Sequence, residues 1–286
     1  MFRENPFRRR FPKAGQAILL LLDVNDTFLR TGPLVKHLCT ADIHGQYAFR
    51  DLVETLSSFH AVNIVFVTGN TYEYVRRVEE PLCLSRFSNV SVGVISEGGL
   101  VARLPAFPEM SWQLKLTDET RKSLDGVPKT IREFVTEPVY YQANEIKVTA
   151  KPSAGRFSEG GCEVTKLSES LGDAVQVYGG HDYIDVYPRS FVNESGAEEA
   201  FVIKGWATRS VLKERAPGFP VAIGDSREDG KMLDAAYERG GLGFWVGNAR
   251  PTSRVHPRTA AEYVDGVNEV LKLLLETVST GSKPNE

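Results

Sequence analysis

The sequence predicts an α/β fold whose mainly parallel sheet is interrupted by an inserted α+β segment. Three observations support this prediction. Short apolar runs alternate with helix-like stretches in both end portions of the chain. Each run is apolar throughout, as in strands that are buried on both faces of a parallel sheet. The middle of the chain, at about 103–200, replaces this rhythm with strands of alternating polarity. We therefore expect the two end portions to form one core.

Five apolar runs are the expected strands of the core sheet. The first is 17–22, which contains four consecutive leucines and leads into Asp23. Polar or glycine residues follow every run. Because open parallel sheets bind ligands beyond the carboxyl ends of their strands, we expect these strand ends to form one site. The other four runs lie at 62–67, 90–95, 220–223 and 243–246.

Helix-like stretches separate these runs, and the inserted segment mixes both kinds of element. The core helices are expected at 47–59, 71–79, 204–214, 227–239 and 262–277. The insertion is expected to contain strands at 145–149 and 183–187 and helices at 118–136 and 163–171. These patterns predict a basic N-terminal arm at 1–16, a core at 17–102 and 201–278, a cap at 103–200 and a disordered tail at 279–286.

Composition and charge narrow the class of protein. With 286 residues, 42% of them hydrophobic, the chain is long enough for one large domain or two smaller ones. The formal net charge of −3 argues against nucleic acid as a partner. The three cysteines lie far apart, which favours a reducing compartment over a disulfide framework. No run reaches the roughly 18 to 20 apolar residues of a membrane span. We therefore expect a cytoplasmic monomer or homodimer with no membrane partner.

Two acids follow apolar strands directly, in a position suited to phosphoryl chemistry. A carboxylate that attacks phosphorus forms an acyl phosphate, which divides a difficult displacement into two easier steps. Mg²⁺ prefers oxygen ligands and commonly binds one or two carboxylates together with substrate phosphate. Asp23 and Asp225 are the expected pair, and Asp229 lies one helical turn beyond Asp225.

Phosphoryl oxygens also need hydrogen-bond donors and positive charge. Thr68 offers a hydroxyl, and the backbone amides of Gly69 and Asn70 precede a helix-like stretch whose dipole favours anions. Lys204 supplies a compact positive charge. Each feature alone is more often a helix cap, a turn or a solvated side chain. Their order along the strand ends favours a phosphate site.

Four segments carry a resemblance to a known family: Asp23-Val24-Asn25-Asp26-Thr27, Thr68-Gly69-Asn70, Lys204-Gly205 and Gly224-Asp225-Ser226-Arg227-Glu228-Asp229. The chain resembles the haloacid-dehalogenase-like hydrolase superfamily over about residues 17 to 275. Within it, the chain is similar to the capped branch of sucrose-, trehalose- and mannosylglycerate-phosphatases. The resemblance implies a Rossmann-like core, an aspartyl-phosphate intermediate and a small sugar phosphate as the substrate.

The resemblance also implies roles for individual residues. Asp23 would be the nucleophile, and Thr68 and Lys204 would hold the phosphate. Mg²⁺ would bind Asp23, Asp225 and the backbone carbonyl of Asn25, while Asp229 would complete the acidic site. A later segment, Val246-Gly247-Asn248-Ala249, also fits the branch and adds Asn248 as a substrate contact.

The sequence departs from the family pattern at Asn25. Phosphatases of this family usually have an aspartate there, which protonates the leaving oxygen and then activates water. An amide does not exchange protons in this way, and the loss of general acid–base catalysis costs about 10²- to 10⁴-fold in rate. Asp26 is adjacent, but in an extended segment its side chain would point away from that of Asn25.

Three alternatives to a normal phosphatase follow from Asn25. The chain could be a catalytically weak member that binds a phosphorylated ligand or a partner protein. It could be a phosphotransferase on the same scaffold, or a variant engineered for slow turnover.

The expected cap carries polar residues on or beside its alternating strands. A solvated sheet face and a substrate-binding face fit this pattern equally well. Polar groups that match hydroxyls would suit a sugar, because unpaired buried partners penalise the wrong ligand. His181 and Arg189 are the candidate substrate contacts, within the set Glu145, Lys147, His181, Asp185, Tyr187 and Arg189.

Overall fold

The chain folds into two compact units. In the computed structural model, one unit comprises Met1–Ser111 with Ile203–Glu286, and the other comprises Trp112–Val202. The structure describes residues 11–13, 15–30, 43–135, 138–153, 162–179, 183–215, 218–247 and 255–281.

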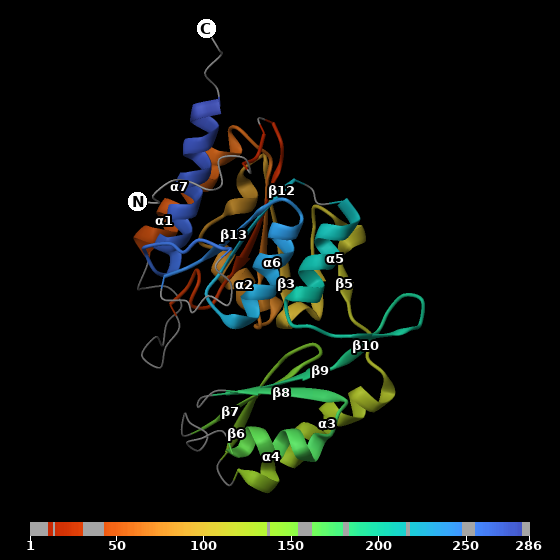
Figure 1. Ribbon diagram of the computed structural model, residues 1–286. Coiled ribbons are helices and arrows are strands. Elements are labelled where there is room, and N and C mark those ends of the chain that lie inside the picture. Colours follow the sequence, from red (N-terminus) through yellow and green to blue (C-terminus); the bar gives the residue numbers. More distant parts are fainter. Residues whose placement is uncertain are drawn as a thin grey trace. The chain divides into compact units, whose positions relative to one another are not determined.

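The central sheet has seven strands in the order β13-β12-β1-β2-β3-β4-β5. The five strands from β13 to β3 are parallel, and β4 is antiparallel to β3. This arrangement confirms the predicted α/β class with a mainly parallel sheet (Figure 1). The strands are β1 (Ile18–Asp23), β2 (Val62–Val67), β3 (Val90–Ser96), β4 (Val101–Arg103), β5 (Trp112–Gln113), β12 (Phe219–Gly224) and β13 (Leu242–Trp245).

Helices cover the sheet in pairs. Helix α1 (Ile43–Ser57) packs against α7 (Tyr263–Gly281), and α5 (Gly205–Arg215) packs against α6 (Gly230–Glu238). Helix α2 (Tyr72–Glu79) follows β2. Short 3₁₀ turns occur at Leu84–Arg86, Glu97–Gly99, Pro108–Met110 and Arg227–Asp229.

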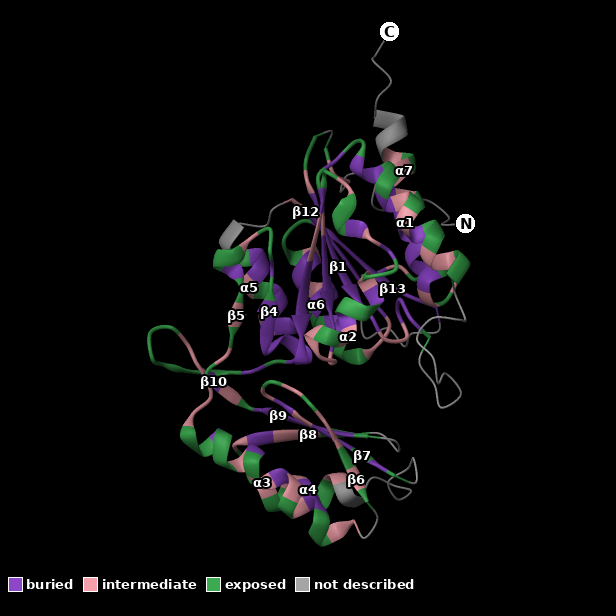
Figure 2. Cartoon of the chain, turned by 180° about the vertical axis from the view of Figure 1, so that it is seen from behind, coloured by how far each residue is buried: buried purple, intermediate pink, exposed green. Residues whose placement is uncertain are grey.

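Strand β1 lies at the centre of the core because it is apolar on both faces. Its residues from Ile18 to Leu22 are all 1% exposed or less. Since successive side chains point to opposite faces, Leu20 and Leu22 join the cluster that contains the apolar faces of α1 and α7. Figure 2 shows the buried central strands of this sheet. The rigid strand fixes the position of Asp23 at its carboxyl end.

The second unit is an α+β structure. Its antiparallel sheet has the order β6-β7-β9-β8, and a separate pair is formed by β10 and β11. One sheet face packs with α3 and α4 around Leu124, Ile131 and Leu167. The elements are α3 (Asp118–Phe134), β6 (Val139–Gln142), β7 (Val148–Pro152), α4 (Cys162–Leu171), β8 (Val175–Gly179), β9 (Ile184–Pro188), β10 (Ser190–Val192) and β11 (Glu198–Ala200).

Some predicted bounds were wrong. The strand expected at 145–149 begins only at Val148, because Gln142 pairs with Thr149 and the residues between them make the hairpin connection. Glu145 and Lys147 therefore lie in a bend instead of a strand. The first core helix begins at Ile43, four residues before the expected start. Among the described helices, none is both long and apolar enough to cross a membrane.

Candidate active site

The turn after β1 holds the first group of site residues. Asp23 is the last residue of the strand and is 3% exposed. The chain then folds back, since the amides of Phe28 and Leu29 both donate to the carbonyl of Val24. Asp26 has a φ of 58°, so it lies in the left-handed region and not in the extended conformation expected from the sequence. This tight turn keeps its polar side chains at the strand end.

Lys204 joins two carboxylates that are far apart in the sequence. Its ammonium group lies 2.5 Å from Oδ1 of Asp23 and 2.5 Å from Oδ1 of Asp229. All three side chains are buried. Lys204 has a φ of 56°, and its amide donates to the carbonyl of Gly98 at 2.6 Å. A strained backbone of this kind persists where its surroundings fix it, as at a functional site. The helix expected to include Lys204 therefore starts one residue later.

Asp229 supports the site from within the core. Its second oxygen, Oδ2, accepts hydrogen bonds from the amides of Asp225 and Ser226 and from the Ser226 hydroxyl. Gly224 makes room for it, since a Cβ at that position would lie 2.4 Å from the Cβ of Asp229. Both Asp229 oxygens are thus engaged by protein donors, and the residue holds Lys204 and the Asp225 backbone in place.

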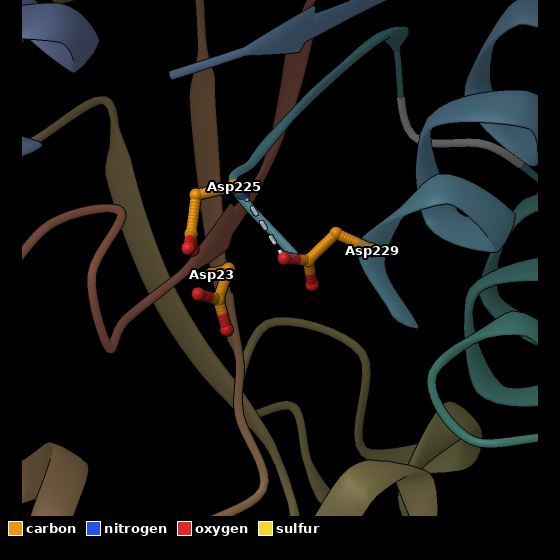
Figure 3. A group of neighbouring side chains, drawn as sticks. All are labelled: Asp23, Asp225 and Asp229. Atoms are coloured by element: carbon orange, nitrogen blue, oxygen red, sulfur yellow. Dashed lines mark hydrogen bonds between the residues drawn. The ribbon is translucent and has the colours of Figure 1, made fainter. Parts of the chain in front are cut away.

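Asp225 completes the acidic cluster at the end of β12. Thr27 donates to its Oδ1 at 2.6 Å, which connects β12 to the turn after β1. Ligand oxygens of Asp23, Asp225 and Asp229 lie within 4.8 Å of one another. Figure 3 shows the three carboxyl groups gathered around one point. The parallel strands β1 and β12 are neighbours in the sheet, which explains why their ends meet.

Burial and mutual repulsion disfavour the ionised form of the carboxyl groups in this cluster. Burial, together with the charge of Asp229, raises the pKa of Asp23 well above its usual value. The same two causes raise the pKa of Asp225 to about 6. Burial lowers the pKa of Lys204, but Asp229 and Asp23 raise it by more, so Lys204 stays charged. One ammonium group faces three carboxylates, and further positive charge would be stabilising here.

The donor set fits a hard cation. Lys204 donates to one oxygen of Asp23, and Thr27 donates to one oxygen of Asp225. Within the described part of the chain, Oδ2 of Asp23, Oδ2 of Asp225 and the carbonyl oxygen of Asn25 accept no hydrogen bond. Two carboxylate oxygens and a carbonyl are ligands that Mg²⁺ prefers, and water or substrate would supply the remaining ligands. The residues present therefore fit the expected ion.

The loop after β2 is fixed by the neighbouring strand end. Thr68 is 1% exposed, and its carbonyl and that of Asn70 accept hydrogen bonds from the amides of Gly98 and Glu97. The Thr68 side-chain oxygen accepts from the Asn70 amide at 3.1 Å. The Asn70 amide is therefore used inside the loop. The Thr68 hydroxyl hydrogen remains available as a donor, as does the Gly69 amide, which makes no hydrogen bond with the described residues.

Asn25 has a partner that the sequence did not reveal. The Tyr74 hydroxyl on α2 donates to Oδ1 of Asn25 at 3.0 Å. Burial, followed by the charges of Asp23 and Asp26, raises the pKa of Tyr74 to about 12. The hydroxyl is thus protonated throughout the physiological range and remains a donor to Asn25.

The second unit contains a buried polar cluster on its sheet. Asp185 accepts hydrogen bonds from Lys147 at 2.7 Å and from Thr149 at 2.5 Å. The Tyr187 hydroxyl lies 3.4 Å from Asp185, and the Lys147 ammonium lies 5.0 Å from the Tyr187 ring centroid. Three of the predicted cap residues therefore come together. Arg189 is separate, since its Nε donates to the carbonyl of Val175 at 2.8 Å. His181 and Asn248 lie outside the described residues.

Sequence reasoning missed the residues that orient the acids. Thr27 belongs to the first motif, but only its contact with Asp225 gives it a role. Ser226 likewise follows a predicted ligand and caps Asp229. Tyr74 has no sequence signal, because an aromatic residue in an amphipathic helix is usually a packing residue.

Comparisons with known proteins identify the fold. Neither a protein-family model nor a curated protein matches the sequence. Solved structures do match. The C-terminal domain of a trehalose-6-phosphate phosphatase from C. albicans is 17% identical, with 92% of this chain and 93% of that chain covered and a TM-score of 0.63. The chain has the haloacid-dehalogenase-like fold.

Two further structures with the haloacid-dehalogenase-like fold cover nearly the whole chain. A haloacid dehalogenase-like hydrolase from Bacteroides thetaiotaomicron is 16% identical, covers 91% of this chain and 99% of that chain, and has a TM-score of 0.61. The trehalose-6-phosphate phosphatase of Aspergillus fumigatus is 14% identical, with 92% of this chain and 93% of that chain covered and a TM-score of 0.55. The resemblance inferred from the motifs is confirmed at the level of the fold.

Proposed function

We propose that this haloacid-dehalogenase-like protein is a Mg²⁺-dependent phosphomonoester hydrolase that acts slowly on a small sugar phosphate. The observation that carries the proposal is the position of Asp23. Its carboxylate is buried, is held through Oδ1 by Lys204, and has an oxygen within 4.8 Å of oxygens of Asp225 and Asp229. A nucleophile needs to be fixed, with one oxygen available, and this arrangement meets that need.

The residues of the site divide the chemistry among them. The Asp23 carboxylate attacks phosphorus, the ester P–O bond breaks, and an aspartyl phosphate forms while the leaving oxygen takes a proton from solvent or a neighbouring group. Water then attacks the phosphorus and releases inorganic phosphate and the Asp23 carboxylate. Lys204, Thr68 and the Gly69 amide bind phosphoryl oxygens throughout. A bound Mg²⁺, held by Asp23, Asp225 and the Asn25 carbonyl, would supply positive charge that offsets the negative phosphoryl group.

A sugar is the favoured alcohol part of the substrate for two reasons. Two of the similar structures are trehalose-6-phosphate phosphatases. The second unit also carries a cluster of polar side chains, Lys147, Thr149, Asp185 and Tyr187, and donors and acceptors of these types match hydroxyl groups.

A phosphatase screen tests the proposal directly. The purified chain would be incubated with a panel of sugar phosphates, including trehalose 6-phosphate, with Mg²⁺ and with chelator, and phosphate release would be measured. We expect slow release that depends on Mg²⁺ for at least one sugar phosphate. The proposed function would be contradicted if phosphate release were equal with and without Mg²⁺. It would also be contradicted if neither the parent nor the Asn25→Asp variant released phosphate from any member of the panel.

Asn25 favours a second candidate function, which is binding of a phosphorylated ligand with little turnover. The amide occupies the place next to the nucleophile without acid–base chemistry, while the groups that bind phosphate are intact. This candidate predicts Mg²⁺-dependent ligand binding and no gain in phosphate release from Asn25→Asp.

We predict that Asp225→Asn weakens Mg²⁺ binding at least about tenfold, because neutralising a hard-cation ligand removes most of its attraction. Isothermal titration calorimetry of the parent and the variant would measure the affinities. Asp234→Asn is a matched control, since Asp234 pairs with His256 away from the cluster and its neutralisation should leave Mg²⁺ binding unchanged. Equal Mg²⁺ affinity of the parent and Asp225→Asn would remove Asp225 from the metal site.

We also predict that residues of the second unit set substrate choice and leave the phosphoryl chemistry unchanged. Asp185→Asn and Arg189→Ala should lower kcat/KM for a sugar phosphate by about tenfold, yet change it little for an aryl phosphate that lacks hydroxyls. Circular dichroism would check that the variants fold. If kcat/KM falls by the same factor for both substrates, these residues do not select the substrate.

A further inference from the structure

The contact between Tyr74 and Asn25 determines which atoms of Asn25 are available to a ligand. A side-chain amide is planar, with an acceptor on one side and two donors on the other. In this structure the acceptor, Oδ1, is engaged by the Tyr74 hydroxyl. Among the described residues, Nδ2 of Asn25 has no hydrogen-bond partner. Asn25 is half-buried, so this donor group is open to a ligand.

Tyr74 is itself held on two sides. Its backbone amide donates to the Thr71 side chain at the start of α2, at 3.3 Å. Its ring packs against the large core cluster that contains Leu20 and Leu22. The hydroxyl therefore reaches Asn25 from a rigid base. A fixed donor of this kind locks one of the two orientations of the amide.

We propose that Tyr74 is a positioning residue that holds the Asn25 amide with its N–H donors available to the bound phosphoryl group. This inference rests on the proposed function. With the opposite orientation, Asn25 would present Oδ1, and an acceptor beside the Asp23 and Asp225 carboxylates would repel an anionic ligand. The locked orientation turns a position that lacks acid–base chemistry into a permanent hydrogen-bond donor. The chain thereby gains ligand affinity at a place where it lacks proton transfer.

The variant Tyr74→Phe tests this role, because it removes only the hydroxyl and keeps the ring in the core. We expect it to weaken the binding of inorganic phosphate by about three- to tenfold, which lies within the usual contribution of one hydrogen bond. Calorimetry in the presence of Mg²⁺ would measure the two affinities. The Asn25 side-chain amide signals in a ¹H–¹⁵N spectrum should also shift on phosphate addition in the parent and shift less in the variant.

Two backgrounds separate positioning from a general structural effect. In Asn25→Ala there is no amide to orient, so adding Tyr74→Phe should leave phosphate affinity unchanged. In Asn25→Asp the two carboxylate oxygens are equivalent, so the second change should again have little effect. A loss of equal size in all three backgrounds would overturn the positioning role.

The outcomes also distinguish this inference from the proposed function. If the parent binds phosphate with Mg²⁺ but Tyr74→Phe binds it equally well, the positioning role is wrong and the function stands. If neither the parent nor any variant binds phosphate, both are wrong.

Discussion

Asn25→Asp should raise the turnover of a well-bound sugar phosphate by about 10²-fold or more, within the usual range for general acid–base catalysis. The aspartate would occupy nearly the volume of the amide and would lie beside Asp23, at the turn after β1. It would be able to donate a proton to the leaving oxygen and later to accept one from water. Steady-state kinetics on the best substrate of the screen would measure the gain.

The leaving group of the substrate gives this prediction a second test. An aryl phosphate needs less protonation of its leaving oxygen, so its first step should gain less from Asn25→Asp than that of a sugar phosphate. Asn25→Ala is the control, since it removes the amide without adding a carboxylate and should bring no gain. A rate within about threefold of the parent for Asn25→Asp would mean that another group supplies the proton or that the site does not hydrolyse phosphate.

Lys204→Met should produce the largest loss of stability. The ammonium group is the shared partner of Asp23 and Asp229, and its removal would leave two buried carboxylates facing each other without a cation. Breaking a buried ion pair in this way costs about 3–5 kcal/mol. Urea unfolding in the presence of chelator would measure the difference in the free energy of unfolding.

Mg²⁺ should restore part of this stability, because an ion that binds only the folded state stabilises it and would replace the missing positive charge. Lys147→Met is a matched control in the other unit. Lys147 is also a buried lysine, 2.7 Å from Asp185, but it has no place in the acidic cluster. Its variant should be destabilised without responding to Mg²⁺. If Mg²⁺ stabilised both variants equally, its effect would not come from the Asp23 site.

The fold could be predicted because its signals are local. Strand β1 is a continuous apolar run, and such a run in this length range forms a strand buried on both faces. The alternation of these runs with amphipathic helices then determined the α/β class. Boundaries that depend on pairing were less accurate. Whether Glu145 and Lys147 extend a strand or turn a hairpin depends on the register between Gln142 and Thr149, which no local pattern encodes.

The candidate site was predictable in its residue types and their order but not in its contacts. Asp23, Thr68 and Asp225 each stand at or just after the end of a parallel strand, and parallel topology brings such ends to one edge. Lys204 directly precedes α5. The sequence did not show that Asp229 has both oxygens engaged by protein donors, or that the Asn70 amide is used by Thr68.

The sequence by itself determined the class of the fold, the identity of the acidic residues and the absence of an acid–base group at Asn25, because these depend on side-chain chemistry and short-range periodicity. Only the tertiary structure decided the partners. Lys204 meets Asp23 across 181 positions and Thr27 meets Asp225 across 198, while Tyr74 reaches Asn25 from helix α2. Such contacts depend on how strands pair and helices pack, and these long-range interactions choose which available donor meets which acceptor.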